Sequence, residues 1–80
     1  MGTNEIKQLL LAALPNCEIS VEGGEGKYLV SATGDIFEGL SAVQRQQTIY
    51  KILNEQISSG VIHAVSMKLQ PPAENLVSLM

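Results

Sequence analysis

Apolar residues recur at helical spacing near the amino end of the chain. They form the stripe Ile6, Leu9, Leu10, Ala13 and Leu14. An apolar residue every three or four positions indicates a helix with one buried face, here over residues 4–14. Thr3 or Asn4 is expected to cap its amino end and Pro15 to end it, because the residue before a proline disfavours helical backbone angles.

Two segments then alternate between apolar and polar residues, which indicates strands with one buried and one exposed face. The apolar faces are Cys17, Ile19 and Val21 in residues 17–22, and Tyr28, Val30 and Ala32 in residues 27–33. The residues between them, Gly-Gly-Glu-Gly at 23–26, predict a tight turn because glycine adopts positive φ without steric cost. An antiparallel hairpin is therefore expected.

A second helix is expected from Ser41 to about Ser58, after an apolar plug of Ile36, Phe37 and Leu40. Ser41 and Gln44 have the spacing of a capping box, in which each side chain accepts the free backbone N–H of the other residue. The expected buried stripe is Val43, Ile49, Tyr50, Ile52, Leu53 and Ile57. Gly60 is placed as the carboxyl-terminal stop of this helix.

The last apolar pattern, over residues 61–70, predicts a third strand. Its more apolar face consists of Val61, Val65, Met67 and Leu69, with His63 at the rim of the same face. Pro71 and Pro72 are expected to end the strand, because proline has no N–H to give to a sheet. A short helical turn is expected from Ala73.

These elements follow one another as helix, strand, strand, helix and strand. One helix carries the chain back between the second and third strands, so these strands are expected to run parallel through a right-handed crossover. The predicted fold class is α+β, with a three-stranded mixed sheet backed by helices. In this topology His63 faces the 23–27 turn, whereas Cys17 lies roughly 20 Å away at the other end of the first strand. His63 and Cys17 are therefore not expected to share a metal ion.

The composition fits a single domain over residues 1–80, with 45% hydrophobic and 16% charged residues. The net charge of −3 argues against a general nucleic-acid binder, whose affinity comes largely from neutralised phosphates. A single cysteine excludes an internal disulfide and fits a reducing cytosol. No apolar run approaches the roughly 20 residues of a membrane span. We therefore expect a cytoplasmic protein without a membrane association.

Few residues in the chain are candidates for chemistry, and none of them forms an arrangement typical of an enzyme. His63 is the main candidate for metal ligation, since neutral imidazole ligates metals well; the alternative is a histidine that packs at the rim of the sheet. Cys17 is expected to be a small buried hydrophobe. Arg45 and Lys51 form an alternative site for nucleic acid, because arginine with neighbouring glutamines reads base edges, although a solvated helix face is the simpler interpretation.

Three groups of residues resemble the BolA family, and within it the IbaG branch. They are Phe37-Glu38-Gly39, then Arg45, Tyr50 and Leu53, then the run Ile62-His63-Ala64-Val65-Ser66-Met67-Lys68. The resemblance covers nearly the whole chain and implies the fold of class II KH domains. It also implies a partner, a monothiol glutaredoxin, with which family members hold a 2Fe–2S cluster. The glutaredoxin and a bound glutathione each give a thiolate, and the histidine at the position of His63 gives an imidazole.

The sequence departs from the family pattern in the turn. Many members carry a second histidine or cysteine there, whereas residues 23–28 contain neither. The loop histidine of IbaG-like members would fall at about Lys27, and a protonated lysine cannot ligate. Either the second ligand is missing or another group such as Glu25 replaces it, although iron–sulfur clusters favour thiolate and imidazole.

Together these observations predict a non-enzymatic adaptor for iron–sulfur trafficking or sensing, connected with the stress response. The isolated chain is expected to carry no cofactor, because one histidine cannot hold a cluster. A DNA-binding regulator that uses Arg45 and Lys51 is the alternative function. A homodimer is an open alternative for the assembly.

Overall fold

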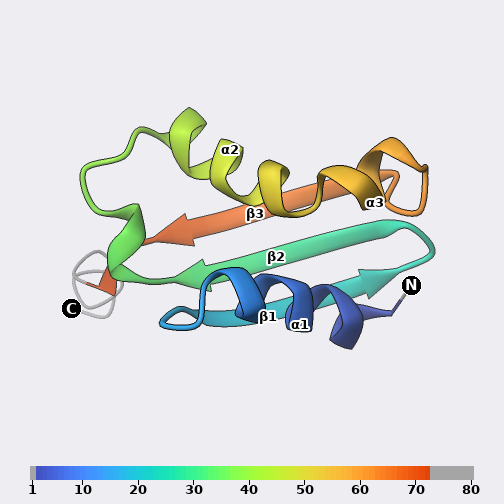
Figure 1. Cartoon of the computed structure of the whole chain (residues 1–80), viewed down its shortest axis with the longest axis horizontal. Coiled ribbons are helices and arrows are strands. Elements are labelled where there is room, and N and C mark those ends of the chain that lie inside the picture. Colours follow the sequence, from blue (N-terminus) through green and yellow to red (C-terminus); the bar gives the residue numbers. More distant parts are fainter. Residues whose placement is uncertain (1, 73–80) are drawn as a thin grey trace.

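The computed structural model describes residues 2–72 and shows an α+β fold with a three-stranded mixed sheet, as predicted (Figure 1). In chain order the elements are helix α1 (Thr3–Ala13), strands β1 (Glu18–Gly24) and β2 (Lys27–Thr33), the short 3-10 helix η1 (Asp35–Phe37), helices α2 (Ala42–Ile52) and α3 (Asn54–Ser58), and strand β3 (Ala64–Gln70). The strand order is β1-β2-β3, with β1 antiparallel and β3 parallel to β2. The helical turn expected from Ala73 lies outside the described residues.

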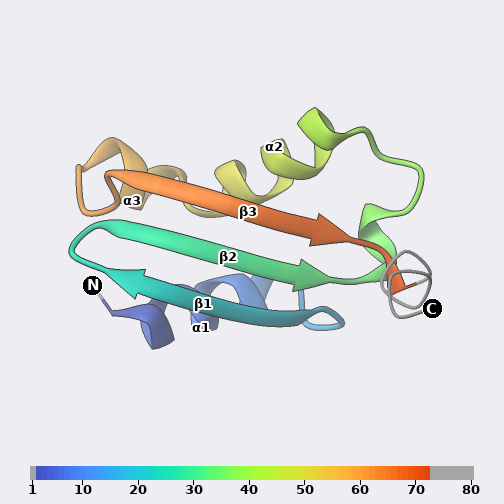
Figure 2. The ribbon, with the colours of Figure 1, turned by 180° about the vertical axis from the view of Figure 1, so that it is seen from behind.

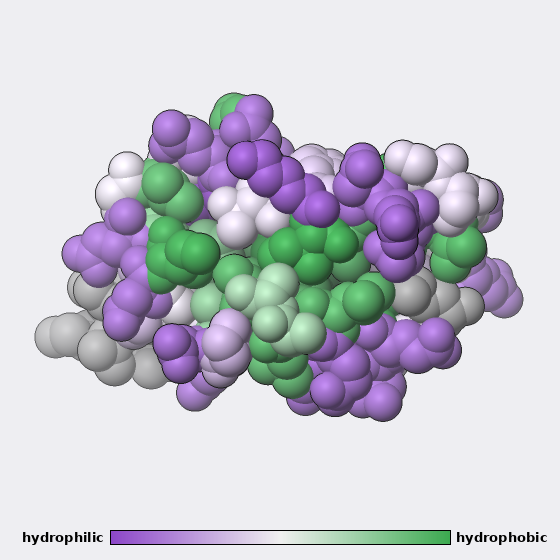
Figure 3. Space-filling view, viewed as in Figure 1, coloured by the Kyte–Doolittle hydropathy of each residue, from purple (hydrophilic) through white to green (hydrophobic). Residues whose placement is uncertain are grey.

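Helices α1 and α2 lie on one face of the sheet, and Figure 2 shows the opposite face without a helix over it. The core between the two layers consists of Ile6, Leu10, Leu14, Ile19, Tyr28, Val30, Ala32, Phe37, Ile49, Leu53 and Ile62. Hydrophobic residues also gather between α1 and α2 on the helical surface (Figure 3). No helix within residues 2–72 has the length and apolar character needed to cross a membrane.

Helix α1 begins one residue earlier than predicted. Its amino-terminal cap is Gly2, whose N–H donates to the Glu5 carboxylate at 3.2 Å, so neither Thr3 nor Asn4 serves as the cap. Ile6 and Leu10 are fully buried, which confirms the centre of the predicted stripe, whereas Ala13 is exposed at its end. The helix stops before Pro15, as the sequence indicated.

The hairpin turn is shorter than the predicted four residues. Gly24 pairs with Lys27, so only Glu25 and Gly26 connect the strands. Their φ angles are 55° and 83°, the two positive values of a type I′ turn, whose twist matches that of the flanking strands. The side chains of Ile19 on β1 and of Tyr28 and Val30 on β2 are buried, which confirms the predicted face of the hairpin.

The predicted second helix is divided at Leu53 into α2 and α3. The capping box is confirmed: the Ser41 N–H donates to Gln44 Oε1 at 3.0 Å, and the Gln44 N–H donates to Ser41 Oγ at 3.2 Å. Val43 and Tyr50 are 62% and 43% exposed, however, whereas Ile49 and Leu53 are fully buried. The predicted stripe is thus confirmed at Ile49 and Leu53 and wrong at Val43 and Tyr50.

Strand β3 begins at Ala64 rather than at Val61, so the predicted alternation of residues 61–63 is wrong. Ile62 is buried and Val61 is 43% exposed, the reverse of what a strand from Val61 requires. The Ile62 N–H donates to the carbonyl of Gln56 at 3.0 Å, and Gly60 has a φ of 83°. Residues 61–63 therefore form the connection from α3 into the sheet, and His63 lies just before the strand.

Candidate functional site

The start of β3 is held against the hairpin turn by one carbonyl. The backbone N–H groups of His63 and Ala64 both donate to the carbonyl of Gly26, at 2.7 Å and 3.1 Å. The parallel register, in which Lys27 is opposite Ala64, places the first residue of each strand at the same end of the sheet. The prediction that His63 faces the turn is therefore confirmed.

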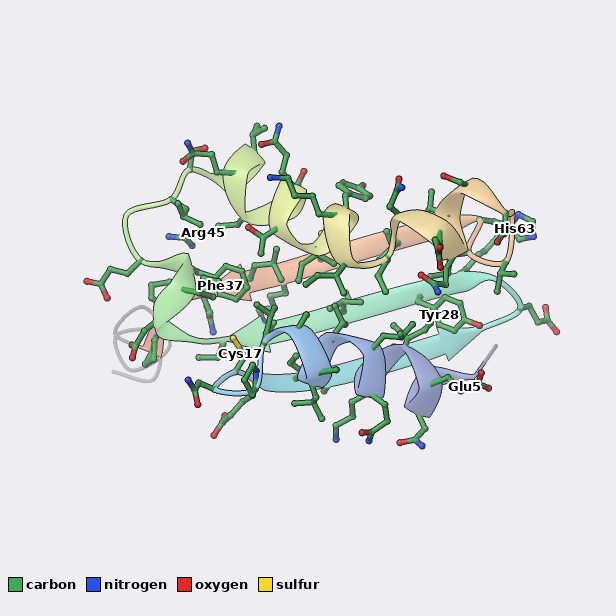
Figure 4. All side chains as sticks on the ribbon, in the orientation of Figure 1. Glu5, Cys17, Tyr28, Phe37, Arg45 and His63 are labelled. Carbon is green, nitrogen blue, oxygen red and sulfur yellow. The ribbon has the colours of Figure 1, made fainter. Side chains whose placement is uncertain are left out.

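The imidazole of His63 lies against Gly26, at one end of the molecule (Figure 4). A Cβ atom built on Gly26 would be 2.3 Å from Cδ2 of His63, well inside van der Waals contact. Gly26 also has the positive φ that favours glycine. The turn thus needs glycine at this position both for its backbone and for the ring beside it. The His63 residue itself is exposed, so the ring is accessible from solvent.

A shallow apolar hollow lies next to His63. It is lined by Tyr50, Ile57, Ile62, His63, Ala64 and Val65. These residues come from α2, from α3, and from the end of the connection and the first residues of β3, so the imidazole lies at the rim of a surface that several segments form. A molecule that contacts the imidazole would also contact this apolar surface.

Glu25 and Lys27, the two other candidates from the turn, are both exposed and flank Gly26. Within residues 2–72, no group of three or more His, Cys, Asp and Glu side chains is placed to hold a metal ion. A metal ion at His63 would therefore need ligands beyond those that residues 2–72 bring to it. Imidazole can replace a thiolate in iron–sulfur clusters, so His63 fits one position of a 2Fe–2S cluster whose other ligands come from elsewhere.

Cys17 lies at the other end of the sheet, as predicted (Figure 4). Its Sγ would be 2.3 Å from a Cβ atom built on Gly34, just beyond the carboxyl end of β2, whereas His63 lies beside Gly26 just before β2 begins. Burial raises the pKa of the Cys17 thiol, and the nearby Asp35 carboxylate raises the pKa further. Cys17 is thus a half-buried, protonated thiol at neutral pH, unsuited to ligation or nucleophilic chemistry.

We expect Cys17 to react slowly with an aromatic disulfide reagent at pH 8 in the folded protein, and to react faster in denaturant.

Because the thiol pKa is higher in the folded than in the unfolded chain, the folded chain holds the proton over a wider pH range. The associated stability is complete below the unfolded pKa, about 8.5, and is lost as the pH rises through the folded value. Between pH 7 and pH 10, the unfolding free energy of the wild-type protein should therefore fall more than that of Cys17→Ala. Equal falls in the two proteins would contradict a raised pKa of the Cys17 thiol.

Arg45 has a structural role that the sequence did not predict. It is half-buried; its Nε donates to the carbonyl of Leu40 at 3.1 Å, and its Nη1 donates to that of Leu69 at 3.2 Å. The guanidinium therefore ties the loop before α2 to the end of β3. Lys51, the other residue of the alternative nucleic-acid site, is exposed on α2. A polar run with exposed glutamines on both sides is typical of a solvated face, so the sequence carried no signal for this role.

Comparisons with known proteins all point to the same family. The model described as BolA-like protein matches residues 12–74. The acid stress protein IbaG of Escherichia coli (strain K12) is 45% identical over 74 residues, which cover 92% of this chain and 88% of that protein.

Solved structures give the same result for the fold. The BolA domain of SufE1 from Arabidopsis thaliana superposes with a TM-score of 0.82 at 30% identity, over 92% of this chain and 98% of that domain. A bolA protein homologue from Coxiella burnetii also gives a TM-score of 0.82 at 30% identity, over 94% of this chain and 96% of that one.

Proposed function

The chain belongs to the BolA family, and from this premise we propose that it is a non-enzymatic adaptor that pairs with a monothiol glutaredoxin. In the pair, His63 supplies one ligand to a 2Fe–2S cluster that the two proteins share for trafficking or sensing. The observation that carries the proposal is the position of His63: an exposed imidazole whose backbone is fixed to the carbonyl of Gly26.

The geometry supports ligation because the ring is held without being covered. The two hydrogen bonds to the Gly26 carbonyl fix the backbone on both sides of the His63 side chain. The close approach of the ring to Gly26 restricts the ring on one side, while the exposed side is open to a partner. A ligand held in this way loses little conformational freedom when it binds, which favours coordination.

His63 would be one of the four ligands that complete a 2Fe–2S cluster. A glutaredoxin cysteine and a glutathione thiolate would be two more, and the fourth would come from another group. An oxidised cluster whose fourth ligand is also an anion carries a net charge of about −1. Lys27 is exposed at the start of β2, opposite Ala64, where its ammonium group would favour an anionic cluster without ligating it. Glu25, an acid on the same turn, would have the opposite effect.

The test is the visible circular dichroism spectrum of this protein purified anaerobically with a monothiol glutaredoxin, glutathione and iron. The complex should give a spectrum distinct from that of the glutaredoxin homodimer, and His63→Ala should abolish this difference. Because His63 is exposed and contributes no buried side chain, the far-ultraviolet spectrum of the variant should equal that of the wild type.

Cys17→Ala is the matched control, since it removes the single thiol of the chain at the opposite end of the sheet and should leave the visible spectrum unchanged. If His63→Ala leaves the spectrum of the complex unchanged, His63 is not the ligand. DNA binding is the competing outcome. It would fall steeply with salt, and the geometry does not favour it because Arg45 already donates to two backbone carbonyls.

A further inference from the structure

Strand β3 forms an edge of the sheet within residues 2–72, because its strand neighbour is β2. The Ala64 N–H donates to Gly26, and the Gln70 carbonyl accepts from Gly34, so the even-numbered residues of β3 bond toward β2. Backbone groups alternate in direction along a strand. Those of Val65, Met67 and Leu69 therefore point away from the sheet, as the bond from Arg45 Nη1 to the Leu69 carbonyl confirms.

This edge lacks most of the features that normally prevent strand addition. β3 is seven residues long, contains neither proline nor glycine, and carries one charged residue, Lys68. Soluble proteins usually protect such an edge with prolines, bulges, several charges or a covering segment. The edge at β1 differs, since Glu18 and Glu22 are charged and Gly23 departs from extended geometry with a φ of 118°. The β3 edge is thus the better template for a further strand.

Helix α2 runs beside β3 (Figures 1 and 2), and two hollows are lined by residues of both elements. We call the two hollows together the groove. The first is the apolar one next to His63, which Ile57 of α3 also lines. The second lies at the other end and is lined by Leu40, Ala42, Arg45, Gln46, Met67 and Leu69. Val65 borders the first hollow and Leu69 the second, and four strand residues span roughly 13 Å. An extended chain places side chains i and i+4 on one face at this same separation.

The charges around the groove differ in sign from the net charge of the protein. The chain has a net charge of −3, yet α2 and β3 contain Arg45, Lys51 and Lys68 and no acidic residue. The acids of the described chain lie on other elements: Glu5, Glu18, Glu22, Glu25, Asp35, Glu38 and Glu55. Of these three cations, Lys68 is exposed on the helix-free side of β3, so an occupant with carboxylates on that side would lie beside a positive charge.

We propose that the groove between α2 and the outer edge of β3 binds an extended acidic segment of a partner protein as a fourth strand. The outward N–H and carbonyl groups of Val65 and Met67 supply the main-chain hydrogen bonds. Alternate apolar side chains of the segment enter the two hollows, and its acidic side chains lie on the helix-free face of the sheet near Lys68. Strand addition beside a helix is a known mode of peptide recognition, in which main-chain bonds give affinity and pockets give specificity.

This site goes beyond the proposed function, because it needs neither iron nor glutathione. The probe is the blocked heptapeptide Asp-Val-Glu-Val-Glu-Val-Asp, titrated into the isotope-labelled full chain while backbone amide NMR shifts are recorded. Shifts should concentrate on the amides of β3 and α2. The charge-reversed peptide, with lysine at each acidic position, should bind at least about tenfold more weakly, and so should the acidic peptide with N-methylated central residues.

Two variants make the test specific. Lys68→Glu reverses the charge next to the groove and should weaken the acidic peptide about tenfold, whereas Lys7→Glu on α1 is the matched control and should have no effect. Met67→Pro removes an outward N–H that makes no bond to β2 and should abolish binding while the amide spectrum stays folded. The proposal is overturned if neither peptide shifts β3 at about 2 mM, if both peptides bind equally, or if a single-stranded oligonucleotide displaces the peptide.

Discussion

Phe37→Ala should lower the free energy of unfolding by about 3–5 kcal/mol, the usual cost of deleting a large buried aromatic side chain. Phe37 is fully buried and is among the largest side chains of the core. It ends η1, where its N–H donates to Gly34 and its carbonyl accepts from Leu40. A domain of this length has a total stability of roughly 4–12 kcal/mol. Much of the variant should therefore be unfolded at 37 °C, as urea denaturation would measure.

Ile36→Ala is the matched control for this experiment. Ile36 is the preceding residue of the same 3-10 helix, but it is 48% exposed. Its truncation removes a smaller, partly exposed apolar side chain without opening a cavity, so the loss should stay below about 1 kcal/mol. Equal losses in the two variants would mean that Phe37 does not occupy the core position described for it.

Gly26→Ala should destabilise the protein by about 2 kcal/mol, because an alanine at a φ of 83° is strained and its Cβ would collide with the His63 ring. The ring can avoid the methyl group only by moving away from the turn. We therefore expect two results: a lower urea midpoint, and changed chemical shifts of the His63 ring protons. The shared-cluster spectrum should weaken as well, since the imidazole is no longer held in place.

Gly24→Ala tests the same turn without the collision. A Cβ atom on Gly24 meets nothing within 4 Å, and Gly24 is not among the residues with positive φ. Its stability should change by less than about 0.5 kcal/mol, and the His63 ring signals should stay where they are. If the two glycine variants behave alike, the turn does not position the imidazole.

The sequence was sufficient to predict the topology, because each strand and helix has its own periodicity. The alternation of residues 17–22 and 27–33 predicted the hairpin, and the single helix between the second and third strands predicted the parallel pairing. These two features together place His63 at the turn. The position of the main candidate residue therefore followed from the order of the elements and not from any local motif.

The errors arose where tertiary contacts decide the structure. Val43 and Tyr50 fit a helical stripe, but the rotation of α2 over the sheet leaves them exposed. Residues 61–63 alternate like a strand, but the Ile62 N–H bonds back to the Gln56 carbonyl and turns Ile62 into the core. The role of Arg45 depends on two carbonyls, one of them 24 residues away. Periodicity cannot predict these exposures and hydrogen bonds. It shows which residues share a face of a helix or strand, but not which part of the protein packs against that face.

The exposed position of His63 at the rim of a two-layer fold has a kinetic consequence. In the proposed role as a cluster ligand, His63 would need no opening motion of the folded chain to gain or lose its metal. Exchange would then be governed by the residence time of the partner, and a brief encounter would be enough to load or unload the imidazole. Such an arrangement suits a relay, which has to pass its cargo on, better than a store, which has to retain it.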